Sequence, residues 1–274
     1  MDTDVQTGWG YTTAFLEVSG AMNNSFPSIE RSQTLLAVRL ALIAGYLDAY
    51  SLLKLGVYIS FMSGNTTMAG VRTGEGHLMS ALAPVLAIPS FVIGGFAGTW
   101  TMTNRKTYSH RLVFLLAAIL LCIVLILASH ESLKLLSIAV LGIAAGLLNP
   151  ALPRIGPESV SLTFMSGNLS RLGRHLALAA RGVPLPDAEG PWDGHLRRAR
   201  LDAYIWAGFF IGTAVSGMLT TQAPQFVLPI AIAAMAALAI FSPSPFASGA
   251  QSKKVSDQLK TPSGAVSAMG NQKP

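Results

Sequence analysis

The sequence predicts an all-α integral membrane protein with six transmembrane helices, arranged as two inverted three-helix repeats that each carry a re-entrant broken segment. Three observations support this fold class. Hydrophobic residues make up 51% of the 274 residues and charged residues only 12%, about half the charged share of a typical soluble domain. Six apolar stretches are long enough to cross a bilayer. The phrase Phe-Met-Ser-Gly-Asn occurs at 61–65 and again at 164–168.

The six apolar stretches are the predicted transmembrane helices. In chain order they cover 34–53, 79–103, 112–128, 133–150, 203–220 and 225–242. Two further segments, 57–72 and 158–179, are apolar but are interrupted by the repeated phrase. Each is too short or too broken for a span, so a re-entrant hairpin and two half-helices that meet at the break are the alternatives.

Loop charge predicts the direction of each span, because cytoplasmic loops carry an excess of Lys and Arg. Basic residues exceed acidic ones in 104–111, in 171–200 and in the C-terminal tail, and Arg31 precedes the first span. The connections 129–134 and 221–226 have no such excess. A trace from a cytoplasmic N-terminus then makes the two broken segments enter from opposite faces. With three spans in each half, the halves have inverted topology.

The same trace divides the chain into four parts. Residues 1–33 form an N-terminal cytoplasmic tail, 34–128 the first membrane repeat, 129–243 the second membrane repeat, and 244–274 a cytoplasmic tail. The last part is rich in Ser, Pro, Gly, Lys and Gln, a composition that predicts disorder. The expected protein is therefore multipass, with both termini in the cytoplasm.

The repeat extends beyond the five-residue phrase. Gly45–Asp48 aligns with Gly146–Asn149, and Gly94-x-x-x-Gly98 aligns with Gly208-x-x-x-Gly212. Glycines four residues apart lie on one helix face and let two backbones approach closely, so these motifs favour helix packing.

The repeated phrase is the predicted substrate site. Glycine lets the backbone bend, and Ser and Asn are preferred helix N-caps. Two half-helix N-termini that meet near the midplane would favour an anion or a carbonyl-type oxygen. The alternative is that the phrases only pack helices together. The predicted substrate-binding residues are Ser63, Gly64, Asn65, Ser166, Gly167, Asn168, Asp48 and Asn149.

Asp48 lies near the end of the first predicted helix, and its repeat counterpart Asn149 is neutral. A carboxylate within the membrane is expensive, so it should pair, take up a proton or bind a cation. Two roles remain open for Asp48: proton or ion coupling, and capping at the membrane interface.

Composition and motifs argue against several function classes. The basic residues lie between apolar runs rather than on a face interleaved with aromatics, which argues against nucleic-acid binding. A single cysteine, Cys122, and five scattered histidines give no metal-ligand spacing. The chain has no serine-hydrolase, zinc-protease or phosphate-loop motif. We predict that it is not an enzyme and that it needs no cofactor.

Gly45–Ser51, followed by the phrase at 61–65, resembles the YoaK family of bacterial multipass membrane proteins. That family typically has an Asp-Ala pair at the end of the first helix and then Met-(Ser/Thr)-Gly-Asn, here Asp48-Ala49 and 62–65. The resemblance covers about residues 33–245 and implies a location in the bacterial inner membrane, but no substrate. This chain departs from the pattern in its complete second phrase and its longer connection at 180–202.

The predicted function is transport of a small solute or an ion, by a transporter or channel whose midplane site is formed by the two phrases. The alternative is a non-transporting membrane scaffold or regulatory protein in which the phrases only pack helices. The expected partners are the lipid bilayer and an unidentified small solute or ion, and the sequence is compatible with a homo-oligomer.

Overall fold

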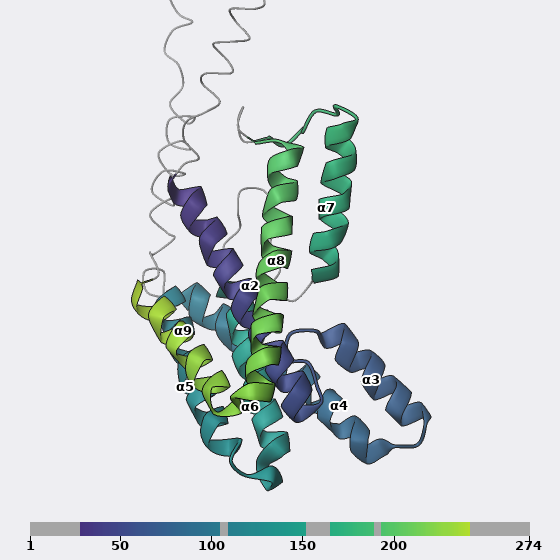
Figure 1. Ribbon diagram of the computed structural model, residues 1–274, viewed down its shortest axis with the longest axis vertical. Coiled ribbons are helices and arrows are strands. Elements are labelled where there is room, and N and C mark those ends of the chain that lie inside the picture. The colour runs from purple at the N-terminus through teal and green to yellow at the C-terminus, as the bar shows by residue number, and fades with distance from the viewer. Residues whose placement is uncertain (1–27, 105–108, 152–164, 189–192, 242–274) are drawn as a thin grey trace, which may run out of the picture.

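The computed structural model describes residues 28–104, 109–151, 165–188 and 193–241 (Figure 1). Within these residues, six helices are long and apolar enough to cross a membrane, which confirms the predicted all-α, six-span class. Most of the predicted N-terminal tail and the whole of the predicted C-terminal tail lie outside the described residues. So do 158–163 and Phe164, which belong to the second broken segment.

Eight α-helices are described. They are α2 (Ser28–Leu55), α3 (Met62–Gly74), α4 (Leu78–Asn104), α5 (Ser109–Leu127), α6 (Lys134–Leu148), α7 (Met165–Ala180), α8 (His195–Gln222) and α9 (Val227–Phe241). Short 3-10 turns lie before α6, after α6 and before α9, at Glu131–Leu133, Asn149–Ala151 and Pro224–Phe226. The six predicted spans correspond to α2, α4, α5, α6, α8 and α9.

Helix α8 begins eight residues before the predicted span, so the prediction that the connection 180–202 runs as far as residue 202 was wrong. Residues 195–202 form the first two turns of α8, and the whole of 165–180 forms α7. The sequence Leu-Arg-Arg-Ala-Arg-Leu has high helix propensity. Its charges do not stop the helix, because several of them pair with acidic side chains described below.

Helix α2 ends at a glycine with positive φ, and this stop leads into the candidate site. Gly56 (φ 75°) follows α2, where its N–H donates to the Ser51 carbonyl at 3.0 Å. Gly76 (φ 79°) and Gly182 (φ 63°) lie two residues after the ends of α3 and α7. A residue in this left-handed conformation is the common end of a helix, and glycine adopts it without steric cost. The chain therefore turns sharply after α2 and enters the non-helical link 56–61.

The first broken segment contains one unbroken helix, not a hairpin or two half-helices, and the described part of the second, from Met165 onward, is also a single helix. Helix α3 packs against α4, and α7 packs against α8. Figure 1 shows α7 directed toward one end of the molecule and α3 toward the other. The expected N-caps were wrong, because α3 begins at Met62 and has Phe61 at its N-cap position without a side-chain cap bond. Asn65 therefore lies inside the first turn of its helix.

The seam between α2 and α8 is a close parallel packing of helix backbones. A Cβ atom on Gly212 would lie 1.9 Å from the Leu42 carbonyl oxygen, and one on Gly45 would lie 2.2 Å from the Phe209 carbonyl oxygen. Val38 faces Gly208 one turn before Leu42 faces Gly212, so the two helices run in the same direction. The glycine motif therefore packs helices, as the sequence predicts.

The seam between α4 and α6 has the same construction. A Cβ atom on Gly94 would lie 2.1 Å from the Ile143 carbonyl oxygen, and one on Gly146 would lie 2.1 Å from that of Phe91. Parallel pairing of α4 with α6 and of α2 with α8 is what alternation of six spans requires.

One part of the repeat alignment is corrected by these contacts. The sequence alignment places Gly94 opposite Gly208. In the structure, Gly94 meets Ile143 and Gly212 meets Leu42. Leu42 and Ile143 are 101 residues apart, as Gly45 and Gly146 are. Gly94 therefore corresponds to Gly212, one helical turn further along α8, because the connection before α8 is longer than the one before α4.

A continuous apolar core lies between the spans, and large apolar side chains also cover the outer faces. Fully buried core residues include Leu47, Phe114 and Ile205. By contrast, Phe96 and Trp100 on α4 are more than half exposed. Exposed apolar surface of this extent is unusual for a soluble monomer and suits contact with lipid.

Candidate functional site

Asp48 is buried near the end of α2, with 4% of its surface exposed, and it organises the link 56–61. Its Oδ1 accepts the backbone N–H groups of Ile59 and Ser60, both at 2.8 Å. The Ser60 hydroxyl donates to Oδ2. Three donors therefore converge on one carboxylate, an arrangement that offsets part of its loss of hydration. Of the two roles left open by the sequence, the geometry directly provides capping.

Asn65 holds the same link from its other side. Its Oδ1 accepts the Tyr58 N–H at 3.0 Å, and its Nδ2 donates to the Tyr58 carbonyl at 2.5 Å. The side chain is buried and lies in the first turn of α3. Asp48 and Asn65 together satisfy the backbone of a link that has no regular secondary structure. The negative charge expected near this helix N-terminus is supplied by Asp48 of the chain itself.

A cavity of about 280 Å³ lies beside this link, and residues from both halves of the molecule form its wall. Its wall includes Asp48, Ser60 and Phe61 from the first half, and Met165 and Thr213 from the second. Phe61 opens the first copy of the repeated phrase and Met165 is the second residue of the other copy. The phrases therefore approach each other, as the sequence predicts, at the starts of their helices.

The other predicted site residues lie around the cavity rather than in its wall. Ser63 and Ser166 are exposed on the outer faces of α3 and α7. Gly64 makes room for the ring of Phe61, since a Cβ there would lie 2.3 Å from the Phe61 Cδ1 atom. Gly167 is buried, and Asn149 is half-buried at the start of the turn that follows α6. Of the eight predicted residues, only Asp48 lines the cavity.

Asn168 has a different environment from Asn65. It is buried, and its Oδ1 accepts a bond from Arg171 Nη2 at 2.6 Å. Arg171 Nη2 also lies 2.8 Å from Oδ1 of Asp202, which is buried on α8. Asn65 and Asn168 are 103 residues apart, and the same offset places Met68 opposite Arg171. This charge pair therefore belongs to the second half alone, although the five-residue phrase is identical.

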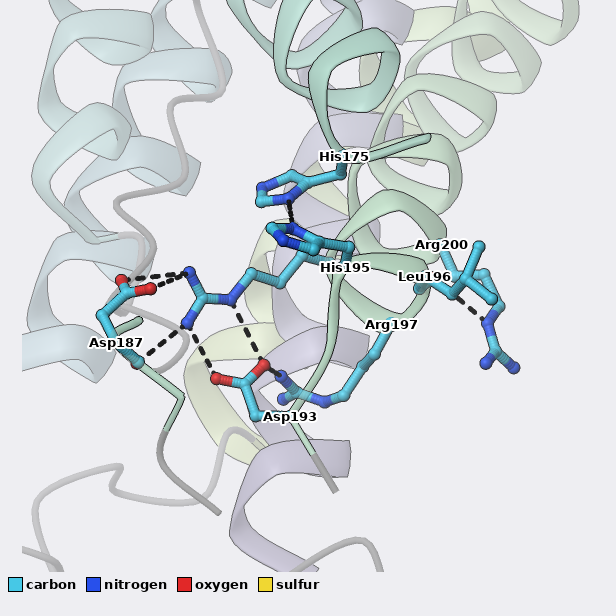
Figure 2. Close-up of polar contacts among 8 residues, drawn as sticks. His175, Asp187, Asp193, His195, Leu196, Arg197 and Arg200 are labelled. Atoms are coloured by element: carbon cyan, nitrogen blue, oxygen red, sulfur yellow. Dashed lines mark hydrogen bonds and ion pairs between the residues drawn. The ribbon is translucent and has the colours of Figure 1, made fainter. Parts of the chain in front are cut away.

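A second polar cluster joins α7, the connection after it and the start of α8 (Figure 2). Asp193 is buried, and its carboxylate accepts hydrogen bonds from Arg197 Nη1 at 2.9 Å and from Arg198 Nη2 at 2.8 Å. Arg198, also buried, reaches the Asp187 carboxylate at 3.1 Å. The charges of this segment thus bind the connection after α7 to the start of α8.

Two histidines meet in the same cluster. The Nδ1 atoms of His175 on α7 and His195 on α8 lie 2.9 Å apart, and both side chains are buried. The sequence separates them by a long connection, so their meeting was not predicted. Among the described residues, no three His, Cys, Asp or Glu side chains are placed to hold a metal ion.

Asp187 should make the stability of this cluster depend on pH. Hydrogen bonding from Arg198 lowers the pKa of Asp187 below its ordinary value of 3.8. Because the folded pKa is the lower one, the contribution is complete above about pH 3.8 and is lost as the pH falls through the lowered pKa. Asp187→Asn should slightly lower the thermal unfolding temperature near neutral pH. It should have no effect at a pH below the lowered pKa of Asp187, where the carboxyl is protonated in both states. An equal difference at every pH would contradict this assignment.

Comparison with known proteins places the chain in a family. The sequence model described as "Protein of unknown function (DUF1275)" matches residues 36–241. The chain belongs to the DUF1275 family. The matched range begins in α2, ends with α9 and includes both copies of the repeated phrase. The candidate cavity is therefore formed within the DUF1275 region.

One curated relative of this DUF1275 protein carries a membrane designation. "UPF0700 transmembrane protein RA0705" of Rhizobium meliloti (strain 1021) is 30% identical over 193 residues, which cover 70% of this chain and 78% of that protein. No solved structure matches the chain. Together with the six apolar helices, the relative supports a multipass membrane protein.

Proposed function

We propose that this DUF1275 protein moves a small solute or an ion across the bacterial inner membrane, as a transporter or channel, through the cavity beside Asp48. The observation that carries the proposal is the meeting of the two repeated phrases at one cavity with a buried carboxylate in its wall. Transporters built from inverted repeats place their sites at the repeat interface, beside interrupted helices. The parallel seams α2–α8 and α4–α6 support such an arrangement.

The cavity wall favours a cation or a neutral solute with hydrogen-bond donors, in place of the anion expected from the helix N-termini. Asp48 is the one charged side chain among the described residues of the wall. The Thr213 hydroxyl donates to the Phe209 carbonyl at 2.9 Å, so its oxygen lone pairs are available as acceptors. A volume of about 280 Å³ lies at the lower limit for ligand pockets, which indicates a small solute.

The proposal includes the orientation and assignment derived from the sequence. In this proposal both termini are cytoplasmic and the two halves are inverted repeats. The protein is also a member of the YoaK family that its sequence resembles. In Figure 1, the start of α2 and the α7–α8 end lie toward one end of the molecule, and the α3–α4 and α5–α6 turns lie toward the other, as alternation requires. The protein acts without catalysis or a cofactor, and its partners are the lipid bilayer and the transported solute.

The scaffold alternative is favoured by one observation. The side chains of Asn65 and Asn168 bond to protein groups and not to the cavity. Substitution of either asparagine would disturb the fold whether or not the protein transports anything. These two residues therefore do not discriminate between the functions, and residues of the cavity wall must be used.

Met165→Trp should fill the cavity and abolish flux. The larger side chain takes up space that a solute would need, while Met165 is only partly buried and tolerates replacement. Flux is measured with purified protein in liposomes, using protons, radioactive sodium and rubidium ions, urea and glycerol as probes. Leu169→Trp is the matched control, because Leu169 lies one turn further along α7 and is exposed. Wild-type flux in the Met165→Trp protein would overturn the proposal.

Thiol labelling then separates a transport cavity from a dry packing seam. In a protein with Cys122 replaced by Ser, cysteines at Ser60 and Met165 should react with a small water-soluble maleimide. A cysteine at Leu47, which is fully buried in the core, should not react. Absence of labelling at both cavity positions in a folded protein would favour the scaffold.

A further inference from the structure

A second hollow, unrelated to the Asp48 cavity, lies along the seam of α2 and α8. It has a volume of about 660 Å³ and is lined by one face of each helix. Over most of its length the wall is apolar, with Leu35, Val38 and Leu42 on α2 and Ala207 and Ile211 on α8. Because both helices are spans whose outer faces suit lipid, this groove opens toward the bilayer.

One end of the groove is basic. Arg197 and Arg200, at the start of α8, both line it. Arg197 is held by Asp193 at 2.9 Å, which fixes its side chain beside the groove. Arg200 is exposed, and Figure 2 shows it pointing away from the Asp187 and Asp193 cluster. Asp193 balances the charge of Arg197, so the net positive charge at this end of the groove comes from Arg200, whose guanidinium bonds only to the Leu196 carbonyl among the described residues.

The order of residues along α8 matches the layers of one membrane leaflet. Tyr204 lines the groove one turn beyond Arg200, and tyrosine is enriched where the head groups meet the hydrocarbon. Beyond it the wall is apolar as far as Ile211. The helix rise makes the distance from Arg197 to Ile211 about 21 Å, whereas one leaflet of the hydrocarbon core is about 15 Å thick. The groove is thus long enough for a head group and an acyl chain.

We propose that this groove binds a phospholipid with an anionic head group. The phosphate lies at Arg200, and one acyl chain lies along Val38, Ala207 and Ile211. Charge complementarity selects an anionic lipid over a zwitterionic one, because the exposed Arg200 attracts the phosphate and no acidic side chain lines the described groove to bind a positive head group. The site does not depend on the proposed transport function, since it uses neither Asp48 nor the repeated phrases.

The test measures lipid binding to the full-length protein in detergent, by native mass spectrometry and by thermal unfolding. Phosphatidylglycerol should bind more tightly than phosphatidylcholine and should raise the unfolding temperature more. Arg200→Gln should weaken phosphatidylglycerol binding by about fivefold, the effect of one arginine near an anionic lipid surface. Arg39→Gln is the matched control, because Arg39 is an exposed arginine of α2 outside the groove, and it should leave the affinity unchanged.

A second variant tests the acyl-chain part of the site. Ala207→Trp should fill the groove and weaken phosphatidylglycerol binding while both arginines remain. Inorganic phosphate alone should neither bind nor stabilise. Equal binding of the two lipids, equal losses in the Arg200 and Arg39 variants, or stabilisation by phosphate alone would each overturn the proposal.

Discussion

Gly212→Leu is expected to abolish the folded protein in detergent. The new Cβ alone would lie 1.9 Å from the Leu42 carbonyl oxygen, and a backbone atom cannot move aside as the end of a side chain can. Helices α2 and α8 would have to separate along the closest seam of the molecule. Ordinary overpacking of a core costs about 1–3 kcal/mol, and a clash with backbone should exceed that range. The measurement is thermal unfolding followed by tryptophan fluorescence and size-exclusion chromatography.

Gly217 provides the matched control on the same helix. A Cβ at Gly217 would meet no atom within 4 Å, so Gly217→Leu should leave the protein folded. Gly217→Ala should even stabilise it, by up to about 1 kcal/mol, through helix propensity. Similar unfolding temperatures for the Gly212 and Gly217 leucine variants would show that the α2–α8 seam is not as close as the structure places it.

Asp48→Leu is expected to destabilise the protein by about 2–6 kcal/mol, because the N–H groups of Ile59 and Ser60 would lose their acceptor and each such loss costs about 1–3 kcal/mol. Asp48→Asn should cost much less, since its oxygen can still accept both N–H groups. Thermal unfolding of the two variants measures the difference. An unfolding temperature for Asp48→Leu equal to that of the wild type would contradict the capping role.

The same pair of variants separates capping from coupling. If Asp48 only caps the link 56–61, Asp48→Asn should retain both the fold and any flux through the cavity. If its charge takes part in transport, Asp48→Asn should remain folded and lose flux. The flux assay is the one described for Met165→Trp, so the two results can be compared directly.

Much of the fold could be predicted because span length and loop charge are properties of contiguous sequence. The start of α8 was missed because a charged segment before a span is typical of a loop. Only the acidic partners of Arg197 and Arg198, which the sequence does not reveal, show that this segment can be helical. The N-caps were missed for a similar reason. The side chain of Asn65 turns back to Tyr58, and the conformation of that link leaves no periodic signal.

The candidate site could be predicted only at Asp48, where burial of a charged side chain in an apolar helix carries a large free-energy cost. A carboxylate at such a position must have hydrogen-bond or charged partners. Its partners are backbone groups of the following link, which no side-chain pattern reveals. Asp202 and the two histidines of the α7–α8 cluster come together from distant sequence positions. An acid at the start of an otherwise basic span was the available signal for Asp202.

The pairing of α2 with α8 also bears on how the chain is made. The Thr213 hydroxyl lies 3.3 Å from the Gly45 carbonyl, and the two residues are 168 positions apart in sequence. At ordinary rates of synthesis the ribosome needs roughly 10–30 seconds to cover that distance. During this interval the face of α2 that carries Gly45 lacks its packing partner α8, so lipid or the insertion machinery must cover it. Helix α2, the earliest of the six described spans in sequence, therefore cannot complete its packing until the fifth, α8, has been made.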